Sequence, residues 1–195
     1  SKATHHSALY DSSATMSGCS VASSVNTYLA NGVPASKIVI GLAFYGKRTS
    51  ASSLGGTARG GYKALVYDVI VKDYLSRLNK DVEYGFDEIA QAPYLIDKTN
   101  GYFITYEDER SITAKCEYAI KNNIGGVMIW ELGEDTSCSL IKEVYNNLKT
   151  ATSFGQVLHA KEISFIHPTT NEKMTFTCDA PKEFYDILKI YEEEI

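Results

Sequence analysis

The 195-residue sequence lacks long hydrophobic runs and lacks an excess of positive charge. Its longest apolar stretch, Ile38–Tyr45, is too short to cross a membrane. The 19 basic and 24 acidic residues give a net charge of −5, which offers no positively charged surface for nucleic-acid phosphates. With 44% hydrophobic residues the chain can bury a sizeable core. We therefore expect a globular protein with neither a membrane nor a nucleic acid as partner.

The cysteines show no pattern that suggests a metal or disulfide site. Cys19, Cys116, Cys138 and Cys178 lie far apart, and none of them forms a Cys-x-x-Cys pair. We expect free thiols, no metal site and no cofactor. The first residues, Ser1–Thr4, do not form a signal peptide, and an export signal in a longer precursor is not excluded. The localisation stays open.

Two apolar segments are typical of strands in a parallel sheet that is buried on both faces. The first is Ile38–Tyr45, where alternation places Tyr45 on the same face as small residues. The second is Gly126–Glu131, where Met128 and Trp130 share one face. Helical patterns precede and follow these strands, and this βα order predicts an α/β protein.

Three segments next to these two strands show the apolar spacing of helices. One helix is expected at Val21–Leu29, ended by Asn31 and Gly32. Ser111 is expected to be the N-cap of a second helix, and a third helix follows the second strand. The buried stripe of the second helix is expected to be Ile112, Cys116, Ala119 and Ile120, and the third helix carries Leu140, Ile141, Val144, Tyr145 and Leu148 at helical spacing.

Residues 49–110, between the two strands, are predicted to form a small α+β insertion. It begins with a loop rich in glycine and serine at Thr49–Gly61, continues with a helix at Leu65–Leu78, and ends with the apolar segment Gly101–Tyr106. Residues 1–150 are expected to form one domain.

The composition changes in residues 151–195. A linker at Ala151–Gly155, a β-hairpin around Pro168–Asn171 and an amphipathic helix at Phe184–Tyr191 are expected there. This tail has four lysines and eight acidic residues, a net charge of −4, so most of the net charge of the chain lies in it.

Three motifs, taken in order, resemble family 18 of the glycoside hydrolases, the family of many chitinases. They are His5-His6-Ser7-Ala8-Leu9-Tyr10, then Lys37–Gly46 with its Phe-Tyr-Gly ending, then Gly125–Glu131. The resemblance covers about residues 1–150 and implies a (β/α)8 barrel in which Ile38–Tyr45 is strand seven and Val127–Trp130 is strand eight. Because a complete barrel needs about 250 residues, we expect an incomplete (β/α)8 barrel.

The family's reaction requires two aspartates and a glutamate on strand four, and the glutamate protonates the leaving oxygen. The N-acetyl group of the substrate then acts as nucleophile. The nearest imitations here are Asp81-Val-Glu83 and Glu107-Asp-Glu109, and neither follows a buried strand. We interpret them as solvated acids at the ends of elements. We therefore expect no catalytic residue in this chain, and no hydrolysis by the chain alone.

The resemblance implies a sugar site for chitin or N-acetylglucosamine oligosaccharides. Trp130 would stack under the sugar, and Tyr45 and Met128 would line the pocket. Lys47 stands where many members have arginine, which keeps the charge but not the planar bidentate contact. A plain core tryptophan is the alternative for Trp130, and the role of Glu131 is open. Members of the family are often secreted or held at the cell surface.

The tail resembles a second, unrelated family. Gln156–Ala160 and Phe165–Pro168, with Thr170, Glu172, Met174 and Phe176, resemble the C-terminal end of RNA pseudouridine synthases over about residues 154–188. That family's catalytic aspartate is missing here, so His159 and His167 are interpreted as structural. A composite chain joined near Ser153 is the expectation. The rival function is that of an RNA-associated or non-catalytic interaction protein, and open strand edges predict self-association.

Overall fold

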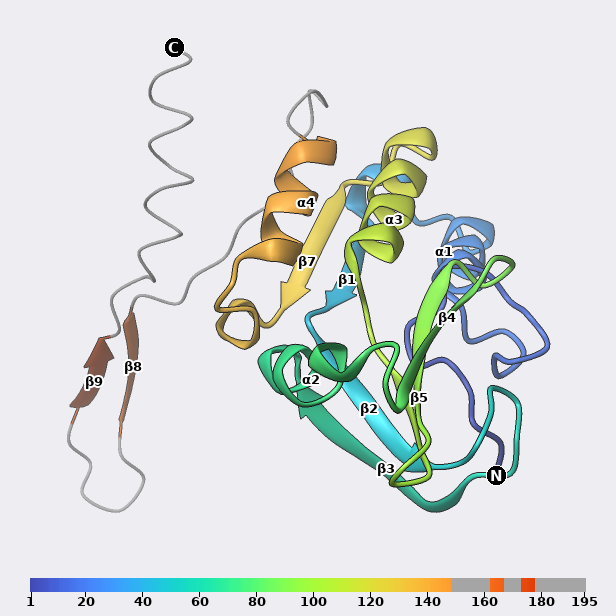
Figure 1. Cartoon of the computed structure of the whole chain (residues 1–195). Coiled ribbons are helices and arrows are strands. Elements are labelled where there is room, and N and C mark those ends of the chain that lie inside the picture. The colour runs from blue at the N-terminus through green and yellow to red at the C-terminus, as the bar shows by residue number, and fades with distance from the viewer. Residues whose placement is uncertain (149–161, 167–172, 178–195) are drawn as a thin grey trace. The chain divides into compact units, whose positions relative to one another are not determined.

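The computed structural model describes residues 1–148, 162–166 and 173–177 and divides the chain into two compact units (Figure 1). The first unit is Ser1–Gln156 and the second is Val157–Ile195. Each unit is described by itself. Among the described residues, no helix has both the length and the apolar character needed to span a bilayer.

A parallel pair of strands forms the centre of the first unit. Strand β1 (Val39–Ala43) pairs with β7 (Gly126–Trp130), and Figure 1 shows them side by side with helix α3 next to them. Both strands were predicted, but the first is shorter than expected. The chain bends at Phe44, so Tyr45 begins another strand in a different sheet. These two strands are the part of a barrel that the chain contains.

The prediction that these strands are buried on both faces is wrong. Ile40 and Leu42 are buried on the face toward the helices, with 3% and 1% of their surface exposed. Val39 is 53% exposed because nothing in the described part of the chain covers the opposite face. A strand in a complete barrel has side chains packed on both sides. The pair therefore has one buried face and one uncovered face.

Helix α1 (Val21–Ala30) agrees with the sequence-based prediction. Ser20 is its N-cap and accepts a hydrogen bond from the backbone N–H of Ser23 at 3.2 Å. The helix ends at Asn31, and Gly32 follows with φ of +81°. That left-handed conformation is one that glycine adopts without the steric cost of a side chain. A short 3-10 helix, η1 (Ala35–Lys37), then leads to β1.

Helix α3 (Glu109–Lys121) begins differently from the prediction, because its N-cap is Asp108 rather than Ser111. Asp108 accepts a hydrogen bond from the Ser111 N–H at 2.8 Å, and the Ser111 hydroxyl accepts one from the Asp108 N–H at 3.0 Å. This reciprocal arrangement is a capping box. Ile112, Cys116 and Ala119 are buried as predicted, but Ile120 is 44% exposed and does not belong to the buried stripe.

Helix α4 (Ser139–Leu148) follows β7 through the 3-10 turn η3 (Leu132–Glu134). Its predicted apolar residues Leu140, Ile141, Val144 and Leu148 are buried. The carboxylate of Asp135 accepts hydrogen bonds from the N–H groups at the start of the helix, including that of Leu140 at 2.8 Å. Asp135 therefore satisfies donors that the helix itself leaves free.

The predicted α+β insertion is present as a five-stranded antiparallel sheet in the order β3-β2-β6-β5-β4. The strands are β2 (Tyr45–Ser50), β3 (Arg59–Val66), β4 (Val82–Asp87), β5 (Ala92–Asp97) and β6 (Tyr102–Thr105). The helix expected at Leu65–Leu78 is shorter, because Leu65 lies in β3. It is reduced to α2 (Tyr67–Asp73) and the turn η2 (Leu75–Arg77). The loop expected at Thr49–Gly61 shrinks to the residues between β2 and β3.

The N-terminal segment, although it has little regular structure, is attached to this insertion. Ala3 and Phe103 belong to one buried cluster, and Ala8 and Ala92 belong to another. The N–H of Leu9 donates to the carbonyl of Ala90 at 2.9 Å. The segment thus forms part of the core of the first unit.

The second unit contains an antiparallel pair of strands, β8 (Glu162–Ile166) and β9 (Lys173–Thr177). The antiparallel pairing of these two strands agrees with the predicted hairpin. The turn around Pro168–Asn171, the helix expected at Phe184–Tyr191, His159 and His167 lie outside the described residues.

Candidate functional site

The uncovered face of the β1–β7 pair gathers the predicted sugar-site residues. Parallel pairing places Gly41 beside Met128 and Ala43 beside Trp130. A Cβ atom on Gly41 would lie 3.6 Å from the terminal methyl of Met128, so the methionine side chain extends over the glycine. Met128 is 40% exposed and Trp130 is 62% exposed. Trp130 is therefore not a core tryptophan in this chain.

A groove of about 360 Å³ lies between β1 and the N-terminal segment with α1, and Met128 and Trp130 of β7 also line it. Tyr45, Met128 and Trp130 line it, together with residues from the N-terminal segment and α1 that include His6, Cys19 and Tyr28. Lys47 does not line the groove. It lies two residues beyond Tyr45 in β2, where it pairs with Ala64 on one side and Thr105 on the other. The structure thus brings three of the four predicted residues together.

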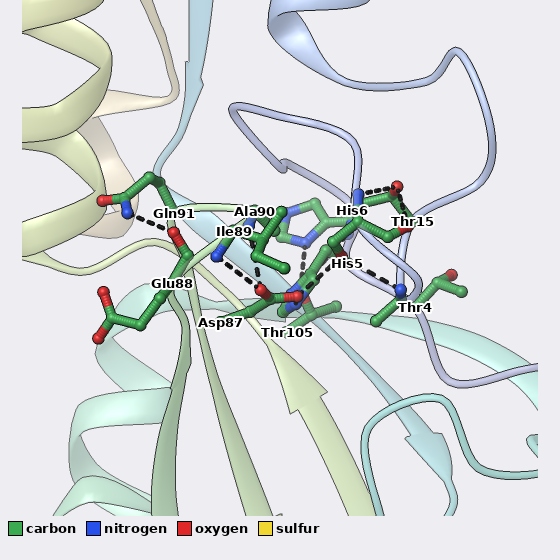
Figure 2. Close-up of polar contacts among 12 residues, drawn as sticks. Thr4, His5, His6, Thr15, Asp87, Glu88, Ile89, Ala90, Gln91 and Thr105 are labelled. Carbon is green, nitrogen blue, oxygen red and sulfur yellow. Dashed lines mark hydrogen bonds and ion pairs between the residues drawn. The ribbon is translucent and has the colours of Figure 1, made fainter.

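His6 is a groove residue that the sequence-based prediction did not single out. Its ring lies 5.3 Å from the ring of Tyr45, measured between centroids. The hydroxyl of Thr105 lies 3.1 Å from Nδ1 of His6 and accepts a hydrogen bond from the His6 backbone N–H at 3.3 Å (Figure 2). Burial, helped by the positive charges of Lys115 and Lys47, lowers the pKa of His6 to about 3. The imidazole is therefore neutral near pH 7.

The neighbouring His5 serves a different purpose. Its Nε2 lies 3.3 Å from a carboxylate oxygen of Asp87, and Figure 2 shows this contact beside that of His6. Asp87 also accepts hydrogen bonds from the Ser12 hydroxyl at 2.8 Å and from the Ala90 N–H at 3.0 Å. Burial lowers the pKa of His5, and Asp87 opposes that shift. This histidine ties the N-terminal segment to the end of β4 and does not line the groove.

A buried ion pair lies behind the groove residue Ser7. Lys115 and Glu107 are both completely buried by side chain and form a salt bridge. Lys115 also donates to the Ser7 carbonyl at 2.6 Å, and Glu107 accepts from the hydroxyls of Ser7 at 2.6 Å and Ser111 at 2.5 Å. The interpretation of Glu107 as a solvated acid is therefore wrong. It is buried because a lysine and two hydroxyls satisfy its charge. The expectation that no buried strand precedes its motif is wrong as well, because β6 ends two residues earlier and its last three residues are buried.

The other acids of the two imitation motifs also have structural partners or are exposed. Asp81 pairs with Arg77, and Glu83 pairs with Lys98 at the surface. Asp108 caps α3 and is buried, so the interpretation as a solvated acid is wrong for it too. Glu109 is exposed in the first turn of α3. These acids are not among the residues that line the groove.

The acids that follow Trp130 lie beyond the end of β7. Glu131 is exposed, and burial together with the negative charge of Glu131 raises the pKa of Glu134. Neither of them lines the groove. Among the described residues, no group of three or more histidines, cysteines and acids could hold a metal ion.

Residues 1–135 match the family described as "Glycosyl hydrolases family 18". The chain belongs to this family. It is 33% identical over 121 residues to a chitinase of Autographa californica nuclear polyhedrosis virus, a match that covers 57% of the chain and 22% of the viral protein. It is 30% identical over 159 residues to chitinase A1 of Niallia circulans, covering 72% of the chain and 22% of that protein.

Solved family 18 structures confirm the fold. An N-acetylglucosaminidase from Paenibacillus barengoltzii matches with a TM-score of 0.68 and 33% identity, over 75% of this chain and 44% of that one. The present chain thus spans about a fifth of the length of these two curated relatives and less than half of the length of this solved structure. Strands β1 and β7 are the two strands of an incomplete (β/α)8 barrel, and the antiparallel sheet is its α+β insertion.

Proposed function

We propose that this family 18 chain binds N-acetylglucosamine oligosaccharides of the chitin type through the groove beside Trp130, and that it does not hydrolyse them by itself. The observation that carries the proposal is the exposed ring of Trp130 next to Met128 in a groove that Tyr45 also lines. The affinity is expected to be weak because one side of the groove is open.

The chemistry of the groove fits a sugar. The C–H groups on one face of a pyranose ring are apolar and make dispersion contacts with an aromatic ring, while its hydroxyls stay in water. Trp130 offers such a surface, and the methionine beside it extends the apolar area. A second aromatic ring, that of Tyr45, lies at the end of the groove where β1 passes into β2.

Proteins with a similar fold support the choice of ligand. A mutant of a class V chitinase from Nicotiana tobaccum was solved in complex with NAG4, with a TM-score of 0.67 to this chain. Human YKL-39, at 0.66, is described as a pseudo-chitinase with retained chitooligosaccharide binding properties. Binding and hydrolysis are thus separable in a protein with this fold, as proposed for this chain.

The proposed lack of hydrolysis follows from the residues that line the groove. Glycosidase chemistry requires a carboxylic acid placed to protonate the leaving oxygen. The groove is lined by aliphatic, aromatic, hydroxyl and thiol side chains and by His6, with no aspartate or glutamate among them. The pKa of His6 is about 3, so near pH 7 its imidazole is not protonated and is a poor general acid.

Titration with chitin oligosaccharides tests the binding directly, because Trp130 is the single tryptophan of the chain and its fluorescence reports on the groove. We expect a saturable change with the N-acetylglucosamine tetramer and a weaker change with the glucose tetramer. Met128→Ala should weaken the response, whereas Ile120→Ala, at an exposed position on α3, should leave it unchanged. No response at saturating ligand would reject the proposal.

A further inference from the structure

The loop that follows Trp130 is hydrogen-bonded to helix α2 of the insertion. It runs from Glu131 to Cys138, between β7 and α4, and Figure 1 shows α2 of the insertion next to it. The N–H of Thr136 donates to one carboxylate oxygen of Asp68 at 3.0 Å, and the Thr136 hydroxyl donates to the other at 2.7 Å. Both oxygens of one α2 side chain therefore bind one loop residue that is 68 positions away.

A second contact joins the same two elements. The hydroxyl of Tyr67 lies 3.4 Å from the hydroxyl of Ser139, the first residue of α4. Tyr67 is buried, and Asp68 follows it in the first turn of α2. The N-cap of that helix, Val66, forms no side-chain hydrogen bond. An acid in the first turn of a helix interacts favourably with the helix dipole. The carboxylate of Asp68 also binds the distant loop.

The segment between Trp130 and Thr136 is short and hydrogen-bonded. The carbonyl of Trp130 accepts a hydrogen bond from the N–H of Phe44 at 2.8 Å, which fixes the end of β7. The next residues form the tight turn η3, where the N–H of Glu134 donates to the carbonyl of Glu131 at 3.1 Å. Asp135 then caps α4. Thr136 and Trp130 are therefore joined by a short, hydrogen-bonded segment.

We infer that Asp68 is a positioning residue for Trp130, so that the insertion, through α2, sets the orientation of the sugar-binding ring. The inference rests on the proposed function for its effect on binding. The claim that Asp68 positions the ring does not rest on the proposed function, because the mobility of the Trp130 ring can be measured without any sugar. Asp68 has no contact with the groove and acts through Thr136 and the turn that follows β7.

The test uses the full chain and the fluorescence of its single tryptophan. Asp68→Ala should lower the time-resolved anisotropy of Trp130 in the free protein and weaken binding of the N-acetylglucosamine tetramer by about threefold to tenfold. This is less than the full worth of the two lost hydrogen bonds, because Asp68 does not touch the sugar. Asp68→Asn should restore both, because an amide can accept from the Thr136 N–H and donate to its hydroxyl. Asp73→Ala, an exposed carboxylate in the last turn of α2, controls for charge and should change neither.

The outcomes separate the two proposals. If Asp68→Ala leaves the anisotropy unchanged, or if Asp73→Ala lowers it equally, the inference is wrong. If Asp68→Ala lowers the anisotropy but no variant binds sugar, Asp68 positions the ring and the proposed function fails. Should Asp68→Ala not fold, Thr136→Val removes one of the two hydrogen bonds and must lower the anisotropy, with Thr136→Ser restoring it.

Discussion

The side chains of Lys115 and Glu107 form an ion pair from which water is excluded on all sides. Removal of one partner leaves an unpaired charge in the core. We therefore predict that Lys115→Met lowers the free energy of unfolding by about 3–5 kcal/mol, as measured by urea denaturation. Lys121→Met, at an exposed position on the same helix, should cost less than about 1 kcal/mol. A similar small loss for both variants would mean that the buried pair is not intact in solution.

The stability of the chain should fall as the pH is lowered from 6.5. The pKa of His6 is about 3 in the folded chain and about 6.5 when unfolded, so below pH 6.5 the unfolded chain binds more protons. The stability from the neutral ring is complete above pH 6.5 and is lost progressively toward pH 3. At pH 5 the loss from His6 amounts to about 2 kcal/mol. His5, whose pKa is also lowered, adds to the trend.

Urea denaturation at pH 7.5 and pH 5 checks this dependence. His6→Asn cannot titrate in this range, so its loss of stability between the two pH values should be smaller than that of the unchanged chain. Equal losses for both proteins would show that His6 is not the group responsible.

The close approach of Gly125 to the segment before β1 predicts a strict size limit. A Cβ atom at this position would lie 2.2 Å from the carbonyl oxygen of Ser36, which belongs to the backbone and cannot turn away. Gly125→Ala should therefore destabilise the chain by about 2 kcal/mol or more in thermal unfolding. Gly133→Ala is the matched control, because nothing lies within 4 Å of its Cβ position. The prediction fails if the two variants unfold alike.

The open edges and the uncovered face of the β1–β7 pair should promote self-association. Val39, Met128 and Trp130 expose apolar surface there, and unpaired strand edges accept further strands. Sedimentation velocity over increasing concentration should show a shift toward dimers or larger species. Val39→Lys places a charge on this face and should reduce the shift. A chain that stays monomeric at all concentrations would contradict this expectation.

The sequence was sufficient to predict which residues share a face. Alternation in β7 placed Met128 and Trp130 together, and backbone geometry makes that relation independent of the surroundings. Exposure could not be predicted in the same way. It depends on what covers the face, and apolar composition alone suggested burial on both sides for Val39, which is 53% exposed.

Two other errors have local physical causes. Ser111 was taken as the N-cap because serine favours that position, but Asp108 lies three residues earlier and the two residues form a reciprocal pair. Glu107 was taken as solvated because a carboxylate is rarely buried. Its partner Lys115 lies eight positions later, within α3, and meets it only in the folded chain. His6 was noted only as part of a motif. Its place in the groove could not be predicted from the sequence, because its contact with Thr105 joins residues 99 positions apart.

Native mass spectrometry of the purified chain with the N-acetylglucosamine tetramer tests the central claim most directly, because one spectrum reports both binding and cleavage. The account predicts a complex that carries the intact tetramer, reduced in Trp130→Ala, and no shorter sugars after prolonged incubation. The absence of any complex at saturating tetramer, or the release of the disaccharide by protein free of contaminating enzyme, would contradict it.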